Sequence, residues 1–211
     1  MYLKVKRAIG FILSLIGLII LSPVFFLLML AIKMDSKGPI FFKQKRVGKN
    51  KEHFEILKFR TMRIDTPKDT PTHLLEDPEQ WITRVGGFLR KTSLDELPQI
   101  INILKGDMSI IGPRPALWNQ YDLIAERDQY GANDILPGLT GWAQINGRDE
   151  LPIEAKAKLD GEYVEKMSFW FDVRCFFGTI LSIFRGDGVV EGGTGVLSRQ
   201  EAASVEENLA K

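Results

Sequence analysis

The sequence predicts an α+β fold, mostly helical, in which an N-terminal membrane helix precedes a small α/β domain with interfacial amphipathic helices. Three observations carry this prediction. Residues 8–32 contain no charged side chain, residues 39–42 and 53–59 are typical of short strands, and apolar residues recur at helical spacing later in the chain. We expect these later helices at residues 81–90, 95–104, 116–128, 152–166 and 168–184.

Composition limits the class of protein. The chain has 211 residues, enough for one domain with its own core. Its 28 Lys and Arg residues nearly balance 27 Asp and Glu residues, so no basic excess points to nucleic acid, and we expect no nucleic-acid partner. Cys175 is the single cysteine, which excludes an intrachain disulfide, and His53 and His73 lack the spacing of zinc ligands.

The uncharged N-terminal run is interrupted by Ser22-Pro23. Proline lacks an N–H and clashes with the carbonyl of Ile19, so a kink is expected, and the Ser22 hydroxyl can bond a freed carbonyl. Basic residues occur on both sides, at 4–7 and at 33–46, and basic flanks favour the cytoplasmic side. Physics alone leaves two topologies equally open: a re-entrant helix with both ends on one face, and a kinked helix that spans the bilayer.

The neighbouring carboxylates of Asp95 and Glu96 are the first candidates for chemistry. They occur where a helix is expected to begin, with Pro98 in the position of a first turn. A structural interpretation is available, because Ser93-x-x-Glu96 is a capping-box pattern and acidic residues complement a helix dipole. In the functional interpretation, a carboxylate attacks phosphorus and the pair provides oxygen ligands for Mg²⁺.

Several cations could face an anionic substrate. Arg114 is held between two prolines, which restrict its backbone, and arginine suits phosphate because its planar fork donates two parallel hydrogen bonds. The other candidates of this kind are Lys58, Arg60 and Arg148. Each of these four residues alone is more often a solvated surface charge.

Two other segments are open to two interpretations each. The aromatic-rich residues 168–184 suit core packing or a membrane interface equally well. Residues 137–148 are dense in turn formers around Trp142, which is typical of a structural loop but would also serve as a backbone cradle.

The chain closely resembles the monotopic phosphoglycosyl transferases, the bacterial sugar transferase family, and in particular its minimal, PglC-type members. The resemblance covers about residues 2–188. It rests on the order of its motifs, which are Ser22-Pro23, Lys58-Phe-Arg-Thr-Met62, Ser93-Leu-Asp-Glu-Leu97, Lys105-Gly-Asp-Met-Ser109, Gly112-Pro-Arg-Pro115, Pro137-Gly-Leu-Thr-Gly-Trp142 and Asn146-Gly-Arg148.

The resemblance implies a re-entrant membrane helix at residues 1–34, a cytosolic catalytic domain at 35–188 and a flexible acidic tail at 189–211. It implies that Asp95 attacks the β-phosphate of a UDP-sugar, releases UMP and passes the sugar phosphate to polyprenyl phosphate, the first membrane step of glycoconjugate synthesis. Mg²⁺ would bind at Asp95, and Glu96 would assist the second step. Arg90, Arg114 and Arg148 match arginines near the family's site and would contact the phosphates and the uridine side. We expect Lys58 and Arg60 to contact the substrate as well.

The resemblance also implies a location at the cytoplasmic face of a bacterial inner membrane. Membrane lipid would be a partner, and the resemblance is compatible with a homo-oligomer. A rival hypothesis is a non-catalytic membrane adaptor in which Ser93 only caps a helix. A third is the same reaction with a hexose instead of a modified amino sugar.

Overall fold

The computed structural model describes residues 2–66, 78–147 and 151–185. Residues 64–80 contain Pro67, Pro71 and Pro78 among polar residues, which predicts a loop, and they lie mostly outside this part of the chain. The acidic tail expected at 189–211 lies wholly outside it, and so does Arg148.

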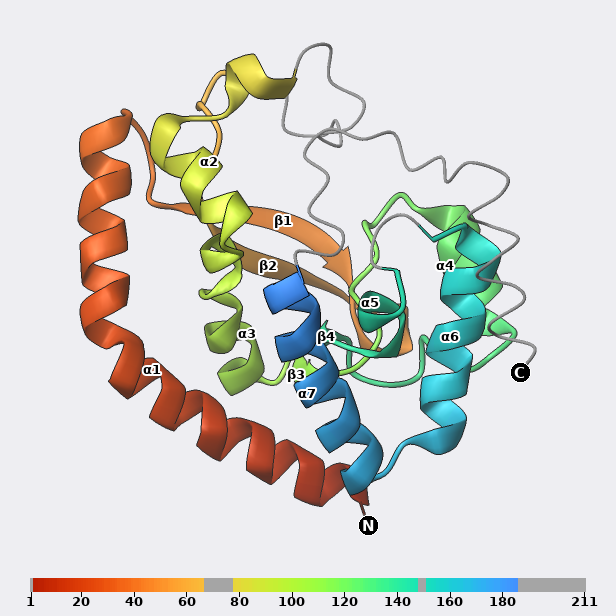
Figure 1. The fold of residues 1–211 in the computed structure, drawn as a ribbon. Coiled ribbons are helices and arrows are strands. Elements are labelled where there is room, and N and C mark those ends of the chain that lie inside the picture. Colours follow the sequence, from red (N-terminus) through yellow and green to blue (C-terminus); the bar gives the residue numbers. More distant parts are fainter. Residues whose placement is uncertain (1, 67–77, 148–150, 186–211) are drawn as a thin grey trace.

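The chain begins with the long helix α1 (Tyr2–Asp35), followed by strands β1 (Phe41–Val47) and β2 (His53–Phe59) (Figure 1). The next elements are the 3₁₀ turn η3 (Pro78–Trp81), α2 (Arg84–Lys91), the 3₁₀ turn η4 (Leu94–Glu96), α3 (Gln99–Lys105) and β3 (Ser109–Ile111). They are followed by α4 (Tyr121–Asp128), β4 (Gly138–Thr140), α5 (Trp142–Ile145), α6 (Ile153–Lys166) and α7 (Phe169–Arg185).

Strands β1 and β2 form an antiparallel hairpin in which Phe41 is opposite Phe59 and Val47 is opposite His53. The first strand begins later than expected, because Pro39 has no N–H for the ladder. Strands β3 and β4 form a separate, short parallel pair. The structure therefore confirms an α+β fold that is mostly helical.

Helix α1 is the one helix among the described residues that is long and apolar enough to cross a membrane. It changes direction about halfway along (Figure 1). Pro23 lies inside the helix, and the hydroxyl of Ser22 donates to the carbonyl of Ile19 at 2.8 Å. The hydroxyl thus satisfies the carbonyl that Pro23 leaves without an N–H partner, as expected.

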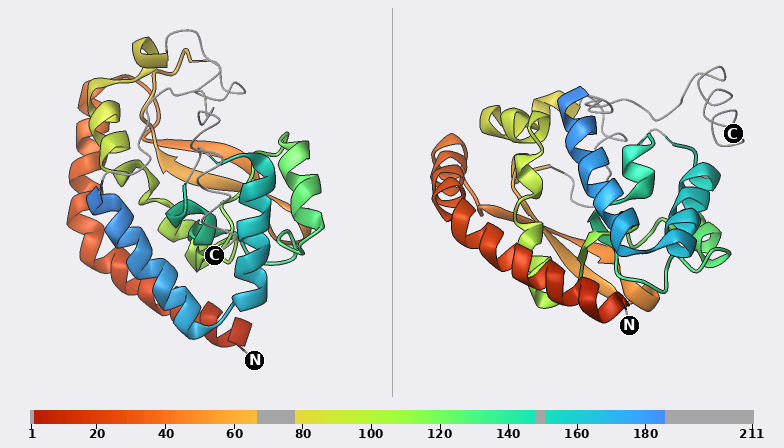
Figure 2. Two further views of the ribbon diagram at one scale, coloured as in Figure 1. Left: turned by 45° about the vertical axis from the view of Figure 1, so that its right-hand side comes forward. Right: turned by 60° about the horizontal axis from the view of Figure 1, so that its bottom comes forward.

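Both ends of α1 are tied to the rest of the molecule. Near its start, Arg7 donates to the carbonyls of Ile103 and Leu104 at the end of α3. At its other end, the Asp35 carboxylate accepts a hydrogen bond of 3.0 Å from the backbone N–H of Val85. The two ends therefore lie on the same domain, and α1 curves around it (Figures 1 and 2).

The inner side of α1 contributes to the core, whereas its outer side does not. Phe25 and Ile32 pack with Phe59 and Leu89 in one buried cluster. The outer residues are left exposed although they are apolar, among them Ile12, Leu13, Ile16, Ile19, Ile20, Phe26 and Leu27. A soluble protein does not normally expose so large a contiguous apolar surface.

Helix α7 divides its aromatic residues between two faces. On the inner face, Phe171 packs against Trp142 and Tyr163, and Cys175 is fully buried. The outer face is exposed and consists of Phe169, Trp170, Phe176, Phe177 and Leu181. Core packing thus explains one face of this helix, and the other face has the composition of a membrane interface.

Candidate active site

Asp95 and Glu96 lie in the 3₁₀ turn η4, ahead of α3. The expectation that a helix begins at Asp95 was wrong, since α3 begins at Gln99, with Pro98 as its N-cap. The capping-box interpretation was also wrong. Ser93 has a left-handed backbone, with φ at 55°, and its side chain makes no capping hydrogen bond to the turn within the described part of the chain.

Glu96 is held by two cations that come from distant parts of the chain. Its Oε1 lies 2.7 Å from Lys58 Nζ, at the end of β2, and 2.8 Å from an Nη of Arg114. Burial alone would raise the pKa of Glu96, but attraction by Arg114 and Lys58 outweighs burial and holds this pKa well below its ordinary range. Glu96 is therefore ionised at neutral pH.

Asp95 is partly buried beside this cluster, with 13% of its side chain exposed, but is bound less closely. Its Oδ2 lies 3.9 Å from Lys58 Nζ, beyond hydrogen-bond distance. Burial raises the pKa of Asp95 above the ordinary aspartate value, Lys58 opposes the rise, and the neighbouring Glu96 adds to it. A desolvated carboxylate with little hydrogen bonding is a stronger nucleophile than a solvated one.

Arg114 owes its position to tight backbone packing. The carbonyl of Pro113 accepts a hydrogen bond of 2.8 Å from Gly138 N, and the carbonyl of Pro115 accepts one of 3.0 Å from Arg46. A Cβ on Gly138 would lie 2.1 Å from Gly112 N, so only glycine permits this contact. The segment predicted as a loop at 137–148 instead contains β4 and α5, and its role in supporting Arg114 is structural, as the first of its two interpretations held.

Lys58 is positioned by a residue that sequence reasoning missed. The side chain of Asn102 is fully buried and accepts a hydrogen bond of 2.9 Å from Leu57 N. It also donates to the carbonyl of Glu55 at 2.8 Å and to Asp107 at 3.1 Å. Asn102 therefore ties strand β2 to α3. Its signal in the sequence was an amide between two isoleucines on a short helix.

Arg90 reaches the site from the last turn of α2. Its Nε donates to Thr61 Oγ1 at 3.0 Å. Its positive charge offsets part of the rise in the pKa of Asp95. Helix α2 lies directly on the backbone of residue 61, because a Cβ on Gly86 would be 2.0 Å from the Thr61 carbonyl oxygen. The structure thus brings Lys58, Arg90 and Arg114 together around the two carboxylates.

Arg60 is not part of this cluster. It is 5% exposed, and its guanidinium donates to the carbonyls of Ser36 and Lys37 at 2.8 Å each. The expectation that Arg60 contacts the substrate stays a prediction. Strand β2 ends at Phe59, so the alternation of side chains along the strand does not place Arg60 beside Lys58, and its guanidinium has different partners. Arg60 instead fixes the chain just after α1.

The residues present fit a magnesium ion that is shared with a substrate. Among the described residues, no group of three or more His, Cys, Asp or Glu could hold a metal ion by itself. Mg²⁺ commonly binds one or two carboxylates and completes its shell with water and substrate phosphates. Asp95 suits this role better than Glu96, whose Oε1 is shared by two cations.

Comparisons with known proteins point to one family. A family model described as bacterial sugar transferase matches residues 1–186. The chain is 40% identical over 195 residues to the UDP-glucose:undecaprenyl-phosphate glucose-1-phosphate transferase of Escherichia coli, a match that covers 86% of this chain and 40% of the relative.

Other relatives include one that is named for a different sugar and one whose name specifies none. The UDP-N-acetylgalactosamine-undecaprenyl-phosphate N-acetylgalactosaminephosphotransferase of Aeromonas hydrophila is 36% identical over 193 residues, which cover 89% of this chain and 45% of the relative. The exopolysaccharide production protein ExoY of Sinorhizobium fredii is 35% identical over 192 residues, 84% of each chain. The chain therefore spans less than half the length of some relatives and most of the length of others.

Proposed function

The chain belongs to the bacterial sugar transferase family, and we propose that it transfers a sugar 1-phosphate from a UDP-sugar to polyprenyl phosphate in a bacterial membrane. The observation that carries this proposal is the site itself. One loosely held carboxylate, Asp95, lies among Lys58, Arg90 and Arg114, and such a cluster suits a nucleophile facing a diphosphate.

The proposed reaction has two steps. An oxygen of Asp95 attacks the β-phosphorus of the UDP-sugar, the bond to the bridging oxygen breaks, and UMP leaves with the electron pair. A phosphate oxygen of the acceptor then attacks the same phosphorus, which releases the Asp95 carboxylate and gives polyprenyl-diphosphate sugar. Lys58 and Arg114 would hold the negative charge of the phosphates, and bound Mg²⁺ would supply further charge neutralisation at the diphosphate.

Glu96 has a separate role in this scheme. It is ion-paired with Lys58 and Arg114, so in the free protein it positions these two cations. When substrate phosphates draw the cations away, Glu96 loses the attraction that keeps its pKa low. We propose that only then can Glu96 assist the acceptor by handling its proton.

The geometry of α1 supports a re-entrant arrangement on the cytoplasmic face. A straight helix of 34 residues would separate its ends by about 50 Å at ~1.5 Å per residue. Here the two ends contact the same domain through Arg7 and Asp35. The outer apolar faces of α1 and α7 would then lie in one membrane leaflet, and the basic residues that flank α1 favour the cytoplasmic side.

The donor sugar is a narrower question. Relatives at 40% and 36% identity are named for glucose and N-acetylgalactosamine, so overall identity does not choose between a hexose and an amino sugar. A panel of donors must decide this point.

The test is UMP release from a panel of UDP-sugars by detergent-solubilised protein with Mg²⁺ and polyprenyl phosphate. Asp95→Asn should abolish UMP release, a loss of at least ~10³-fold, because the amide is no nucleophile. Asp122→Asn is the matched control, since Asp122 is an exposed carboxylate on α4. UMP release that survives in Asp95→Asn would disprove the assigned nucleophile, and no release from any donor by folded protein would favour a non-catalytic adaptor.

Magnesium has its own measurement in the same assay. EDTA should stop UMP release, and added Mg²⁺ should restore it, because the diphosphate needs charge neutralisation that three cations alone do not complete. Full activity in the presence of EDTA would contradict the proposed requirement.

A further inference from the structure

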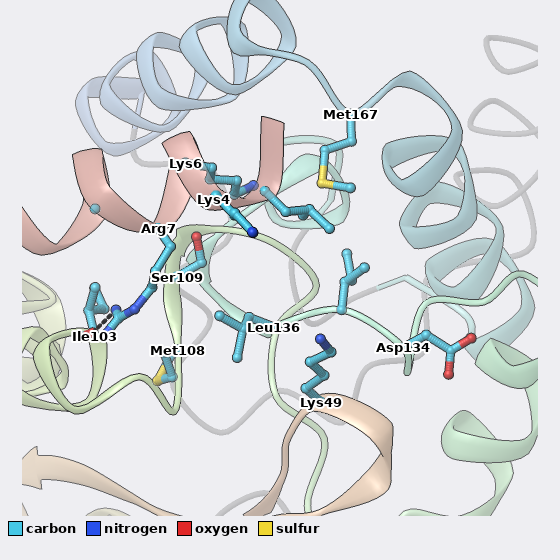
Figure 3. Close-up of a pocket in the computed structure, with 13 residues that line it drawn as sticks. Lys4, Lys6, Arg7, Lys49, Ile103, Met108, Ser109, Asp134, Leu136 and Met167 are labelled. Carbon is cyan, nitrogen blue, oxygen red and sulfur yellow. Dashed lines mark hydrogen bonds between the residues drawn. The ribbon is translucent and has the colours of Figure 1, made fainter. Parts of the chain in front are cut away.

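A pocket lies away from the carboxylates, between the start of α1 and the domain (Figure 3). Its volume is about 340 Å³. Its walls are largely apolar and include Leu3 of α1, Met108, Leu136 and Met167. We call it the α1 pocket.

Two lysines aim their ammonium groups into this space. Figure 3 shows Lys4 of α1 and Lys49 of the turn after β1 pointing into the pocket from opposite walls, whereas the carboxylate of Asp134 points away from it. Neither lysine forms an ion pair with any of the described residues. Both are therefore available to an anion.

The other charged groups at the pocket are already engaged. Lys6 lies 2.9 Å from Asp172, and Arg7 donates to the backbone carbonyls of Ile103 and Leu104. Within the described residues, the pocket thus presents two cations that form no ion pair beside apolar walls, and the one carboxylate among its lining residues, that of Asp134, is directed away from the space between them (Figure 3). Such a lining suits a ligand with an anionic head and an apolar body.

The surroundings indicate where this ligand comes from. The pocket opens at the start of a helix whose outer face is apolar, and Met167 in its wall precedes the exposed aromatic residues Phe169 and Trp170 of α7. Exposed aromatic and apolar side chains at this place are typical of the level of lipid headgroups. We infer that the α1 pocket binds the phosphate headgroup of an anionic membrane phospholipid through Lys4 and Lys49.

This ligand is distinct from the acceptor in the proposed function. Asp95 lies ahead of the first residue of α3, while Ile103 at the other end of this helix lines the pocket. The four steps from Gln99 to Ile103 rise roughly 6 Å at ~1.5 Å each, beyond the ~3–3.5 Å at which reacting atoms meet. A phosphate in the α1 pocket is therefore too far from Asp95 to react with it.

The experiment measures lipid binding by native mass spectrometry of the full chain in detergent, titrated with dioctanoyl phosphatidylglycerol or dioctanoyl phosphatidylcholine. Phosphatidylglycerol should bind about tenfold more tightly, a preference that Lys4→Gln/Lys49→Gln removes. The control, Lys105→Gln/Lys158→Gln, changes the net charge equally at exposed lysines outside the pocket and should keep the preference. If the first double variant does not fold, Lys49→Gln alone should weaken the same binding.

Three results would overturn the inference. The first is an unchanged lipid preference in Lys4→Gln/Lys49→Gln, or an equal loss in the control pair. The second is glycerol 1-phosphate binding as tightly as the lipid, which would assign the site to free phosphate. The third is displacement of phosphatidylglycerol by an equal concentration of farnesyl phosphate, which would assign the site to the acceptor. Because binding needs no turnover, none of these results depends on the proposed reaction.

Discussion

Asp95 and Glu96 are adjacent in the chain, yet their carboxylates have opposite electrostatic surroundings. Glu96 accepts close contacts from Lys58 and Arg114, and its pKa is held low. Asp95 is partly buried, its nearest cation is Lys58 at 3.9 Å, and its pKa is raised. A pair of acids whose pKa values are pushed apart in this way is typical of sites where the two groups have different tasks.

This difference predicts a particular pH dependence. In the proposed reaction Asp95 must be ionised to attack, so UMP release should fall as the pH decreases through the pKa of Asp95, which lies above the ordinary aspartate value. Lys58→Met removes a charge that stabilises the ionised form, so the acid limb should move to higher pH. The measurement is the pH profile of single-turnover UMP release, with Lys43→Met as the control on the neighbouring strand, where Lys43 pairs with the exposed Glu55. If the acid limb lies at the same pH in Lys58→Met, Lys58 does not affect the ionisation of Asp95.

Asn102 allows a stability prediction at the same scale. Asn102→Ala leaves the N–H of Leu57 without its side-chain acceptor in a buried position, and such a loss costs about 1–3 kcal/mol. Urea unfolding followed by tryptophan fluorescence should show this loss. Gln129→Ala, which removes only an exposed hydrogen bond to Glu126, should change stability by less than ~0.5 kcal/mol. Equal effects of the two substitutions would contradict the anchoring role of Asn102.

Helix α2 packs directly against the backbone next to the candidate site. Its N-cap Thr83 accepts a hydrogen bond from Gly86 N, and Gly86 lies against the backbone of Thr61. Gly86→Ala would therefore push α2 away and withdraw Arg90 from Asp95, at a cost of about 1–3 kcal/mol and with a lower rate of UMP release.

The adjacent glycine provides the control for this prediction. A Cβ on Gly87 would meet only a side-chain atom of Ile82 at 3.9 Å, an ordinary contact. Gly87→Ala should thus leave stability unchanged or raise it slightly, because alanine favours helix. Thermal unfolding of both variants tests the difference, and an equally stable Gly86→Ala would show that α2 does not need its close approach to Thr61.

The elements also show what the sequence could and could not predict. Periodicity located α2, α6 and α7 to within a few residues, and Ser22-Pro23 predicted the bend in α1. The beginning of α3 was missed because the left-handed backbone of Ser93 is set by tertiary packing, which a capping pattern does not encode.

The site was predicted in the same uneven way. The motifs supplied Asp95, Glu96, Lys58 and Arg114, which the structure brings together. Their pairing could not be read from the chain, because Lys58 and Glu96 are 38 residues apart and meet only when β2 packs on α3. The sequence alone therefore could not show that Arg60 differs from the other cations, because its binding to backbone carbonyls is visible only in the structure.

At the scale of the whole molecule, α1 joins membrane attachment to the geometry of the site. It packs on α2 and β2 through Phe25 and Ile32 and on the end of α3 through Arg7. The elements that carry the candidate site are thus packed directly against the helix that is expected to enter the bilayer. A site in this place can meet both a water-soluble donor and a membrane-bound acceptor.

The topology of α1 can be tested with single cysteines, because Cys175 is fully buried. Leu3→Cys and Lys37→Cys place exposed reporters before and after the apolar run. In a re-entrant arrangement, a membrane-impermeant maleimide should label neither reporter in intact spheroplasts and both after lysis. In the background of Ser22→Ala and Pro23→Ala the helix loses the cause of its bend, so part of the Leu3→Cys population should become labelled from outside. Labelling of Leu3→Cys in intact spheroplasts with Ser22 and Pro23 in place would instead mean that α1 crosses the bilayer. The contacts of Arg7 with α3 would then have to break in the membrane-bound protein.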